Sequence, residues 1–204
     1  MKKLILLLTL FGSLQSAHSQ EVHFSTGKNF TTYNFKTPSG TSDSNTFKGT
    51  GNFYEVGFSQ SLSNEKFSYS AGLALNEYNS VSFDRTNDSS WETQYLGLQA
   101  GFSYSIIEDG DIDIVPQLGL NLSTLVSGKQ YLDGAYYNLS KEKEFSGLLA
   151  TPSLGVQVKY NLSSDGFVSL GYNYCKGFNL SNSTDQKITF NTSQLQFGVH
   201  YNIR

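Results

Sequence analysis

The chain has 204 residues, a formal net charge of −3, and a composition that is 38% hydrophobic, 14% aromatic and 15% charged. Charges of mixed sign form no clustered basic run, which excludes a nucleic-acid partner. The single cysteine, Cys175, excludes an internal disulfide. No metal site or cofactor is expected, because only His23 and His200 follow the leader and no calcium loop or phosphate loop is present.

An export signal opens the chain. Residues 1–19 combine a basic start, an apolar run from Leu4 to Phe11 and small residues before a cut at Gln20. The apolar run is shorter than the roughly 20 residues of a membrane-spanning helix. We therefore predict a signal peptide over 1–19 and a single domain over 20–204, with no lipid-anchor cysteine after the signal.

Stretches of alternating apolar and polar residues follow the signal. The eight expected strands are Val22 to Phe35, Gly51 to Leu62, Lys66 to Phe83, Glu92 to Ile107, Asp111 to Tyr131, Glu144 to Leu162, Phe167 to Phe178 and Lys187 to Ile203. Strands of soluble proteins usually span about 5 or 6 residues. A tilted strand that crosses a bilayer needs about 9 to 11 residues, so the lengths favour a membrane barrel.

Short turns and long polar loops alternate between these strands. Tight turns are expected at 63–66, 108–111 and 163–166, and the last two contain an Asp-Gly pair suited to the positive φ of a hairpin turn. The expected long loops are Thr37 to Thr50, Asp84 to Trp91, Leu132 to Lys143 and Asn179 to Gln186. Short turns at one rim and long loops at the other are typical of outer-membrane barrels.

The residue types on the two faces predict which face meets lipid. Every second residue over 96–106, 112–122 and 148–158 is apolar or aromatic, and none of these positions is charged. A Lys or Arg at the bilayer midplane costs about 2 to 4 kcal/mol, which explains a face without charge. This face is therefore predicted to point outward.

The opposite face holds mainly Gly, Ser, Thr, Gln and Asn, which suit a narrow polar lumen. Cys175 also lies on this face, as a small buried residue. The interior of an eight-stranded barrel is just wide enough for side chains to fill, so no wide pore is expected. The expected inward residues of a polar plug are Glu55, Asp113, Lys159, Asn173, Gln196 and His200.

Aromatic residues near the strand ends predict a girdle at the two membrane interfaces. They are Phe53, Tyr54, Phe67, Tyr69, Phe83, Trp91, Tyr95, Tyr104, Tyr131, Tyr160, Phe167, Phe178 and Tyr201. Three residues fit the pattern badly. Pro116 and Pro152 each remove a ladder donor, which predicts a bulge or bend, and Lys28 interrupts the first alternating stretch.

The export signal, the eight alternating strands and a terminal run resemble the small outer-membrane β-barrel family. The run is Leu195, Phe197, Val199, Tyr201 and Ile203. This porin-like family is similar to the OmpX proteins and the transmembrane domain of OmpA. Its members commonly end in an aromatic residue that the barrel-assembly machinery recognises, whereas this chain ends in Ile203 and Arg204.

The resemblance implies an all-β fold, an eight-stranded antiparallel up-and-down transmembrane β-barrel. It also implies the outer membrane of a Gram-negative cell, inserted by the barrel-assembly machinery and surrounded by lipid and lipopolysaccharide. We expect a monomer.

The outer loops are the expected site of function, because binding residues concentrate on loops held by a rigid scaffold. Loop 132–143 carries Tyr136 and Tyr137, and loop 84–91 carries Arg85, Asp88 and Trp91. Either loop is expected to contact a surface partner or lipopolysaccharide. The predicted role is therefore structural or loop-mediated.

The residues suggest three other functions beside this role. A Ser25, His23 or His200, and Glu55 set can be sketched as catalytic, but the Gly-x-Ser-x-Gly elbow is absent, so no enzyme and no catalytic residue is predicted. A soluble lipocalin-like barrel with an apolar ligand and a narrow channel are the alternatives.

Overall fold

The computed structural model describes residues 20–36, 47–62, 66–83, 88–106, 110–132, 134–142, 145, 147–180 and 187–203. The predicted signal peptide and parts of all four predicted long loops lie outside these ranges. Within them, no helix is long and apolar enough to cross a membrane.

The described residues are almost entirely β-strand. In chain order the elements are β1 (Gln20–Lys36), β2 (Phe47–Ser61), β3 (Phe67–Glu77), β4 (Ser80–Phe83), β5 (Asp88–Tyr104), β6 (Ile112–Leu132), β7 (Ala135–Asn138), the 3-10 helix η1 (Leu139–Lys141), β8 (Leu148–Asn161), β9 (Gly166–Asn179) and β10 (Lys187–Ile203).

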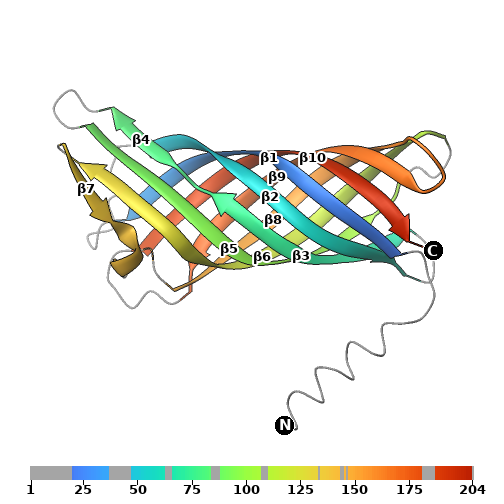
Figure 1. Ribbon diagram of the computed structural model, residues 1–204, viewed down its shortest axis with the longest axis horizontal. Helices are drawn as coiled ribbons and strands as arrows, with labels where there is room; N and C mark the ends of the chain where they lie inside the picture. Colours follow the sequence, from blue (N-terminus) through green and yellow to red (C-terminus); the bar gives the residue numbers. More distant parts are fainter. Residues whose placement is uncertain are drawn as a thin grey trace, which may run out of the picture.

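The strands close into a barrel (Figure 1). Antiparallel pairing runs β1–β2–β3–β5–β6–β8–β9–β10, and β10 pairs with β1 from Gln20 opposite Ile203 to Lys36 opposite Lys187. Strand β4 pairs with β5 and β2, and so extends β3 along the barrel wall, while β7 folds back onto β6. The predicted eight-stranded up-and-down barrel is confirmed, with β1 starting and β10 ending at the same rim.

The predicted and observed bounds differ in places: β2 begins at Phe47 and β5 at Asp88, both inside predicted loops. The strand expected over 66–83 is divided at Tyr78 and Asn79, where the Asn79 side-chain oxygen accepts the Thr93 backbone N–H at 3.2 Å in place of a ladder bond. The loop expected over 132–143 contains β7 and η1. A local hydrogen bond thus interrupts the predicted strand at Asn79, and pairing of β7 with β6 orders part of the predicted loop.

The two Asp-Gly turns have different conformations. Gly110 has a φ of 109°, as the pair predicts, but Gly166 does not adopt a positive φ and begins β9. Instead, the Ser163 hydroxyl oxygen accepts the backbone N–H groups of Gly166 at 3.1 Å and Asp165 at 3.4 Å. A serine turn therefore replaces the predicted glycine turn.

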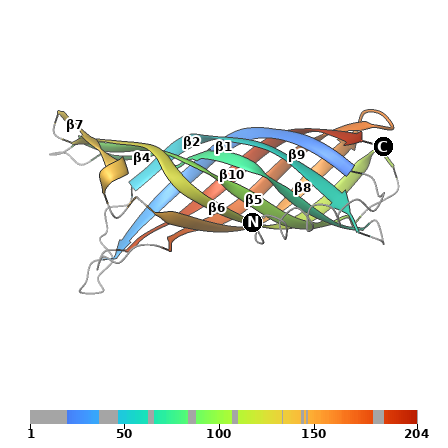
Figure 2. The ribbon, with the colours of Figure 1, turned by 60° about the horizontal axis from the view of Figure 1, so that its bottom comes forward.

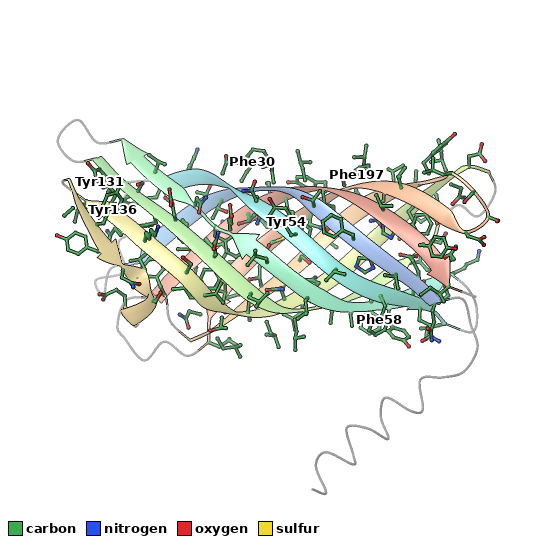
Figure 3. All side chains as sticks on the ribbon, in the orientation of Figure 1. Phe30, Tyr54, Phe58, Tyr131, Tyr136 and Phe197 are labelled. Carbon is green, nitrogen blue, oxygen red and sulfur yellow. The ribbon has the colours of Figure 1, made fainter. Side chains whose placement is uncertain are left out.

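The side chains that the sequence predicts to face lipid lie on the outside of the barrel. Phe102, Leu118 and Leu154 are register neighbours on β5, β6 and β8, and all three are exposed, Leu118 to 59%. The other expected outward positions are exposed too, except Pro116, which is half-buried, and Ala150, which is buried. Figure 3 shows side chains projecting around the barrel, including Phe30, Tyr54, Phe58 and Phe197. The lipocalin-like alternative is wrong, because its apolar face would point inward.

Lys28 belongs to an arc of polar side chains on the outer face. Its Nζ donates to Asn52 Oδ1 at 2.6 Å, and Asn52 Nδ2 donates to Glu77 Oε2 at 2.8 Å. Gln94 Nε2 donates to Glu77 Oε1 at 3.1 Å. The arc crosses the outer face of β1, β2, β3 and β5. Lys28 therefore interrupts the alternation as a member of this arc, and the outward Phe30 follows it on β1.

The predicted aromatic girdle is only partly correct. Tyr54, Phe67, Tyr104, Tyr160, Phe178 and Tyr201 are exposed on the outer face. Phe53, Trp91, Tyr95 and Phe167 are inward and buried, because each occupies an inward position in the alternation. Tyr69 and Tyr131 are half-buried, and the side chain of Phe83 is outside the described set.

The two prolines interrupt the ladder without shifting it. The β6–β8 register is continuous through Pro116, and the β5–β6 ladder ends at Ser103 and Gln117, one residue before Pro116. The β8–β9 ladder omits Pro152 but resumes in the same register. The register shift in the β5–β6 pairing lies instead between Gln94 and Tyr95. The predicted bulge at each proline is therefore wrong, and the alternative of a local bend stays a prediction.

Gly27 allows a close approach of β1 and β10. A Cβ at this position would strike the Leu195 carbonyl oxygen and would lie 2.9 Å from Gln196 Cα, and neither backbone atom can move aside. We expect Gly27→Ala to lower the free energy of unfolding by about 1–3 kcal/mol, as overpacking does. Gly101→Ala is the control, because its Cβ would meet the rotatable Ser70 hydroxyl at 2.7 Å. Urea unfolding should show the larger loss for Gly27→Ala, and equal losses would contradict this account.

Candidate functional site

The lumen contains a polar cavity of about 90 Å³. Five of the six predicted inward residues line it: Glu55, Lys159, Asn173, Gln196 and His200. The sixth, Asp113, is half-buried, and its Oδ2 accepts the Ser105 hydroxyl at 2.7 Å. Cys175 also lines the cavity and is buried, as predicted. A volume of this size has room for a few water molecules.

Amide side chains form a hydrogen-bonded chain across the lumen. Gln117 Nε2 donates to Asn173 Oδ1 at 2.8 Å, and Asn173 Nδ2 donates to Gln194 Oε1 at 3.1 Å. Gln194 Nε2 donates to Asn29 Oδ1 at 2.9 Å, and Asn29 Nδ2 donates to Asn76 Oδ1 at 3.2 Å. The sequence predicted an inward Asn173, and the same alternation places Gln117, Asn29 and Gln194 on that side.

Charged side chains gather nearer the rim where β1 begins and β10 ends. His200 Nδ1 lies 2.6 Å from Glu21 Oε1, and Lys159 Nζ lies 3.5 Å from Glu21 Oε2. His23 Nε2 lies 3.2 Å from Glu55 Oε1. The structure therefore brings together the predicted Glu55, Lys159 and His200. Glu21, which the sequence reasoning missed, is the residue that joins His200 to Lys159.

The sketched catalytic set is only partly assembled. His23 contacts Glu55, but the serine hydroxyl at 2.8 Å from His200 Nε2 belongs to Ser169. Ser25 is buried, and it faces the lumen rather than the lipid. The arrangement is that of a hydrogen-bonded polar interior.

An aromatic cluster fills the lumen at the other end of the barrel. We call it the aromatic plug; its buried members are Tyr33, Tyr78, Trp91, Tyr95, Leu139, Phe145, Leu149 and Phe190. The Trp91 ring stacks on Phe47 at 4.9 Å between centroids and meets Tyr33 edge-on at 5.6 Å. Trp91 was expected on an exposed loop, and this is wrong because its position in β5 points inward. The plug was missed because aromatic residues suit either face of a strand.

A hairpin formed by the end of β6 and by β7 projects from the plugged end. Figures 1 and 2 show β7 at the end of the barrel opposite the C-terminus. Leu139, directly after β7, is 1% exposed and belongs to the aromatic plug, so it anchors the hairpin. Tyr136 is 78% exposed and Tyr137 53% exposed. The predicted contact residues of loop 132–143 are therefore held outward on a short strand, whereas Arg85 lies outside the described residues.

Solved structures of outer-membrane proteins resemble this chain at low identity. The attachment invasion locus protein Ail of Yersinia pestis is 14% identical, with 89% of this chain and 98% of that chain covered and a TM-score of 0.40. Neisserial surface protein A is 14% identical, with coverages of 87% and 96% and a TM-score of 0.44. OprG from Pseudomonas aeruginosa is 12% identical, with coverages of 92% and 98% and a TM-score of 0.49.

A search of curated proteins finds no match. The family model described as the outer membrane protein beta-barrel domain matches residues 4–202. That span covers the closed ring of strands up to the penultimate residue of β10, with its apolar outer face and polar lumen. The chain therefore belongs to the outer membrane protein β-barrel domain family and is an outer-membrane protein.

Proposed function

We propose that this barrel has a structural or loop-mediated interaction role and forms no wide pore. The observation that carries the proposal is the aromatic plug, which fills the lumen at the end where the β6–β7 hairpin projects. Behind the plug, the cavity of about 90 Å³ is crossed by hydrogen-bonded amides. This interior favours surface recognition over transport of a solute.

The contact surface in this proposal is the β6–β7 hairpin. Tyr136 and Tyr137 offer aromatic area and hydroxyl groups together, a combination that is enriched in binding interfaces. Tyr131 supports the hairpin, since its ring lies 5.1 Å from that of Tyr136. The proposal includes a non-enzymatic monomer, exported by residues 1–19, inserted by the barrel-assembly machinery and surrounded by lipopolysaccharide.

Replacing both hairpin tyrosines tests the role. Tyr136→Ser with Tyr137→Ser should reduce adhesion or serum resistance of cells that carry the protein at least tenfold, since the loss of one interface aromatic that contributes about 2 kcal/mol weakens binding roughly thirtyfold. The control is Leu162→Ser, an exposed apolar residue in the turn at the opposite rim. Both variants should migrate as folded, heat-modifiable barrels on gels.

Conductance measurements test the closed lumen. The folded wild-type protein in planar bilayers is expected to show no stable conductance steps. Stable steps would support the narrow-channel alternative and contradict the proposal.

The role of the hairpin would be contradicted by a different result. In that case the double-tyrosine variant would keep adhesion, serum resistance and envelope integrity at wild-type levels.

A further inference from the structure

We infer that the lumen binds a divalent transition-metal ion, Zn²⁺ by its chemistry, between Glu21, His23 and His200. One potential ligand atom from each of these residues lies within 4.8 Å of the others. All three side chains line the lumen cavity, and both histidines are buried. This site is separate from the hairpin surface and does not depend on its proposed role.

Barrel closure creates the cluster. His23 of β1 and His200 of β10 are direct register partners, and their ring centroids lie 5.6 Å apart. Glu21 precedes His23 by two positions and therefore points to the same side of β1. The sequence predicts no metal site, because only two histidines follow the leader. Pairing of the first and last strands brings them together.

His23 presents a buried nitrogen that lacks a partner. The residue is 7% exposed, and its Nδ1 has no hydrogen-bond partner among the residues that the structure describes. Its Nε2 lies 3.2 Å from Glu55 Oε1. When Nε2 carries the proton and donates it to Glu55, Nδ1 offers a lone pair. A carboxylate that orients a histidine in this way is the usual support of a metal ligand.

His200 has a similar support on its far side. Its Nδ1 contacts Glu21 Oε1 at 2.6 Å, and its Nε2 contacts Ser169 Oγ at 2.8 Å. Gln157 Nε2 also donates to Ser169 Oγ at 2.8 Å, which holds the hydroxyl in place. A metal ion would bind His200 Nδ1 and the Glu21 carboxylate, and it would displace the proton that these two groups share. The neutral ring would then carry its proton on Nε2 and donate it to Ser169 Oγ.

The charges facing the site favour a dication. The described inward charges near it are the carboxylates Glu21, Glu55 and Asp113 and the ammonium of Lys159, giving 1 − 3 = −2 with neutral histidines. Lys159 opposes a metal ion, but its Nζ also lies 4.5 Å from the centroid of the Phe167 ring, a cation–π contact that holds it to one side. Removing this ammonium should therefore tighten metal binding.

The donor set selects the kind of metal. Imidazole nitrogens suit Zn²⁺, Cu²⁺ and Ni²⁺, whereas Mg²⁺ and Ca²⁺ prefer oxygen ligands. Two histidines and one carboxylate leave a fourth Zn²⁺ position for water, for which the adjoining cavity has room. Because the ligands come from β1 and β10, a bound ion would cross-link the strands that close the barrel and stabilise the folded state.

Metal titration of the untagged protein in detergent tests the inference. Co²⁺, followed by its visible absorption, should bind one ion per chain and be displaced by Zn²⁺ but not by Ca²⁺ or Mg²⁺. Zn²⁺ should also raise the urea midpoint of unfolding. His23→Asn, His200→Asn and Glu21→Gln should each weaken binding by more than tenfold, and Lys159→Met should tighten it.

Glu55→Gln keeps all three ligands and should weaken binding about 10–100-fold, as loss of a supporting carboxylate does. The Glu55→Gln variant remains informative even if a histidine variant fails to fold. Loss of heat-modifiable migration on gels would reveal such a failure. Glu77→Gln, a carboxylate of the outer polar arc, is the matched control and should bind like the wild type. Absence of Co²⁺ binding by the folded protein, or unchanged affinity in Glu55→Gln and in the folded histidine variants, would overturn the site.

Discussion

Trp91→Ala is expected to lower the free energy of unfolding by about 3–5 kcal/mol, the usual cost of removing a buried Trp side chain. Trp91 is 9% exposed, and its ring contacts those of Tyr33, Phe47 and Phe145 at centroid distances of 5.6, 4.9 and 5.8 Å. These three rings come from β1, β2 and the segment before β8. Alanine would leave a cavity among them that a closed barrel wall cannot collapse to fill.

Urea unfolding followed by circular dichroism measures this loss, because Trp91 is the only tryptophan and its removal eliminates the tryptophan fluorescence signal. Tyr137→Ala is the control, since that exposed aromatic residue lies outside the plug and should change the unfolding free energy by less than about 0.5 kcal/mol. Trp91→Phe should fall between the two. Equal effects of Trp91→Ala and Tyr137→Ala would show that the plug is not a packed core.

Leu118→Arg is expected to lower the free energy of unfolding in a bilayer by about 2–4 kcal/mol. Leu118 is 59% exposed and lies between the outward residues Phe102 and Leu154. It occupies the central part of the apolar face of β6, so a guanidinium there would lose its hydration to hydrocarbon. Trp91 fluorescence during urea unfolding in phospholipid vesicles reports this loss.

Tyr136→Arg is the matched control for the charge. Tyr136 is 78% exposed on the projecting hairpin, where arginine remains hydrated and should change the unfolding free energy by less than about 0.5 kcal/mol. If Leu118→Arg were as stable as this control, the apolar outer face would not be in contact with lipid.

The sequence predicted the barrel well because two of its properties are local. Alternation with a period of two assigns each residue to one side of a strand, and the predicted outward side carries no charge over 96–106, 112–122 and 148–158. The outward Leu118 and the inward Asn173 and Lys159 follow directly from this. Turn conformations were less predictable. The turn at 163–166 is shaped by hydrogen bonds to the Ser163 hydroxyl rather than by a positive φ at Gly166.

The sequence alone determined the number of strands, the lipid-facing side and the polar character of the lumen, since each depends on neighbouring residues. The tertiary structure alone decided the aromatic plug and the meeting of Glu21, His23 and His200. The physical reason is that closure depends on register between distant strands, which alternation does not encode. A shift of His200 by two positions along β10 would preserve every inward and outward assignment and still separate it from His23.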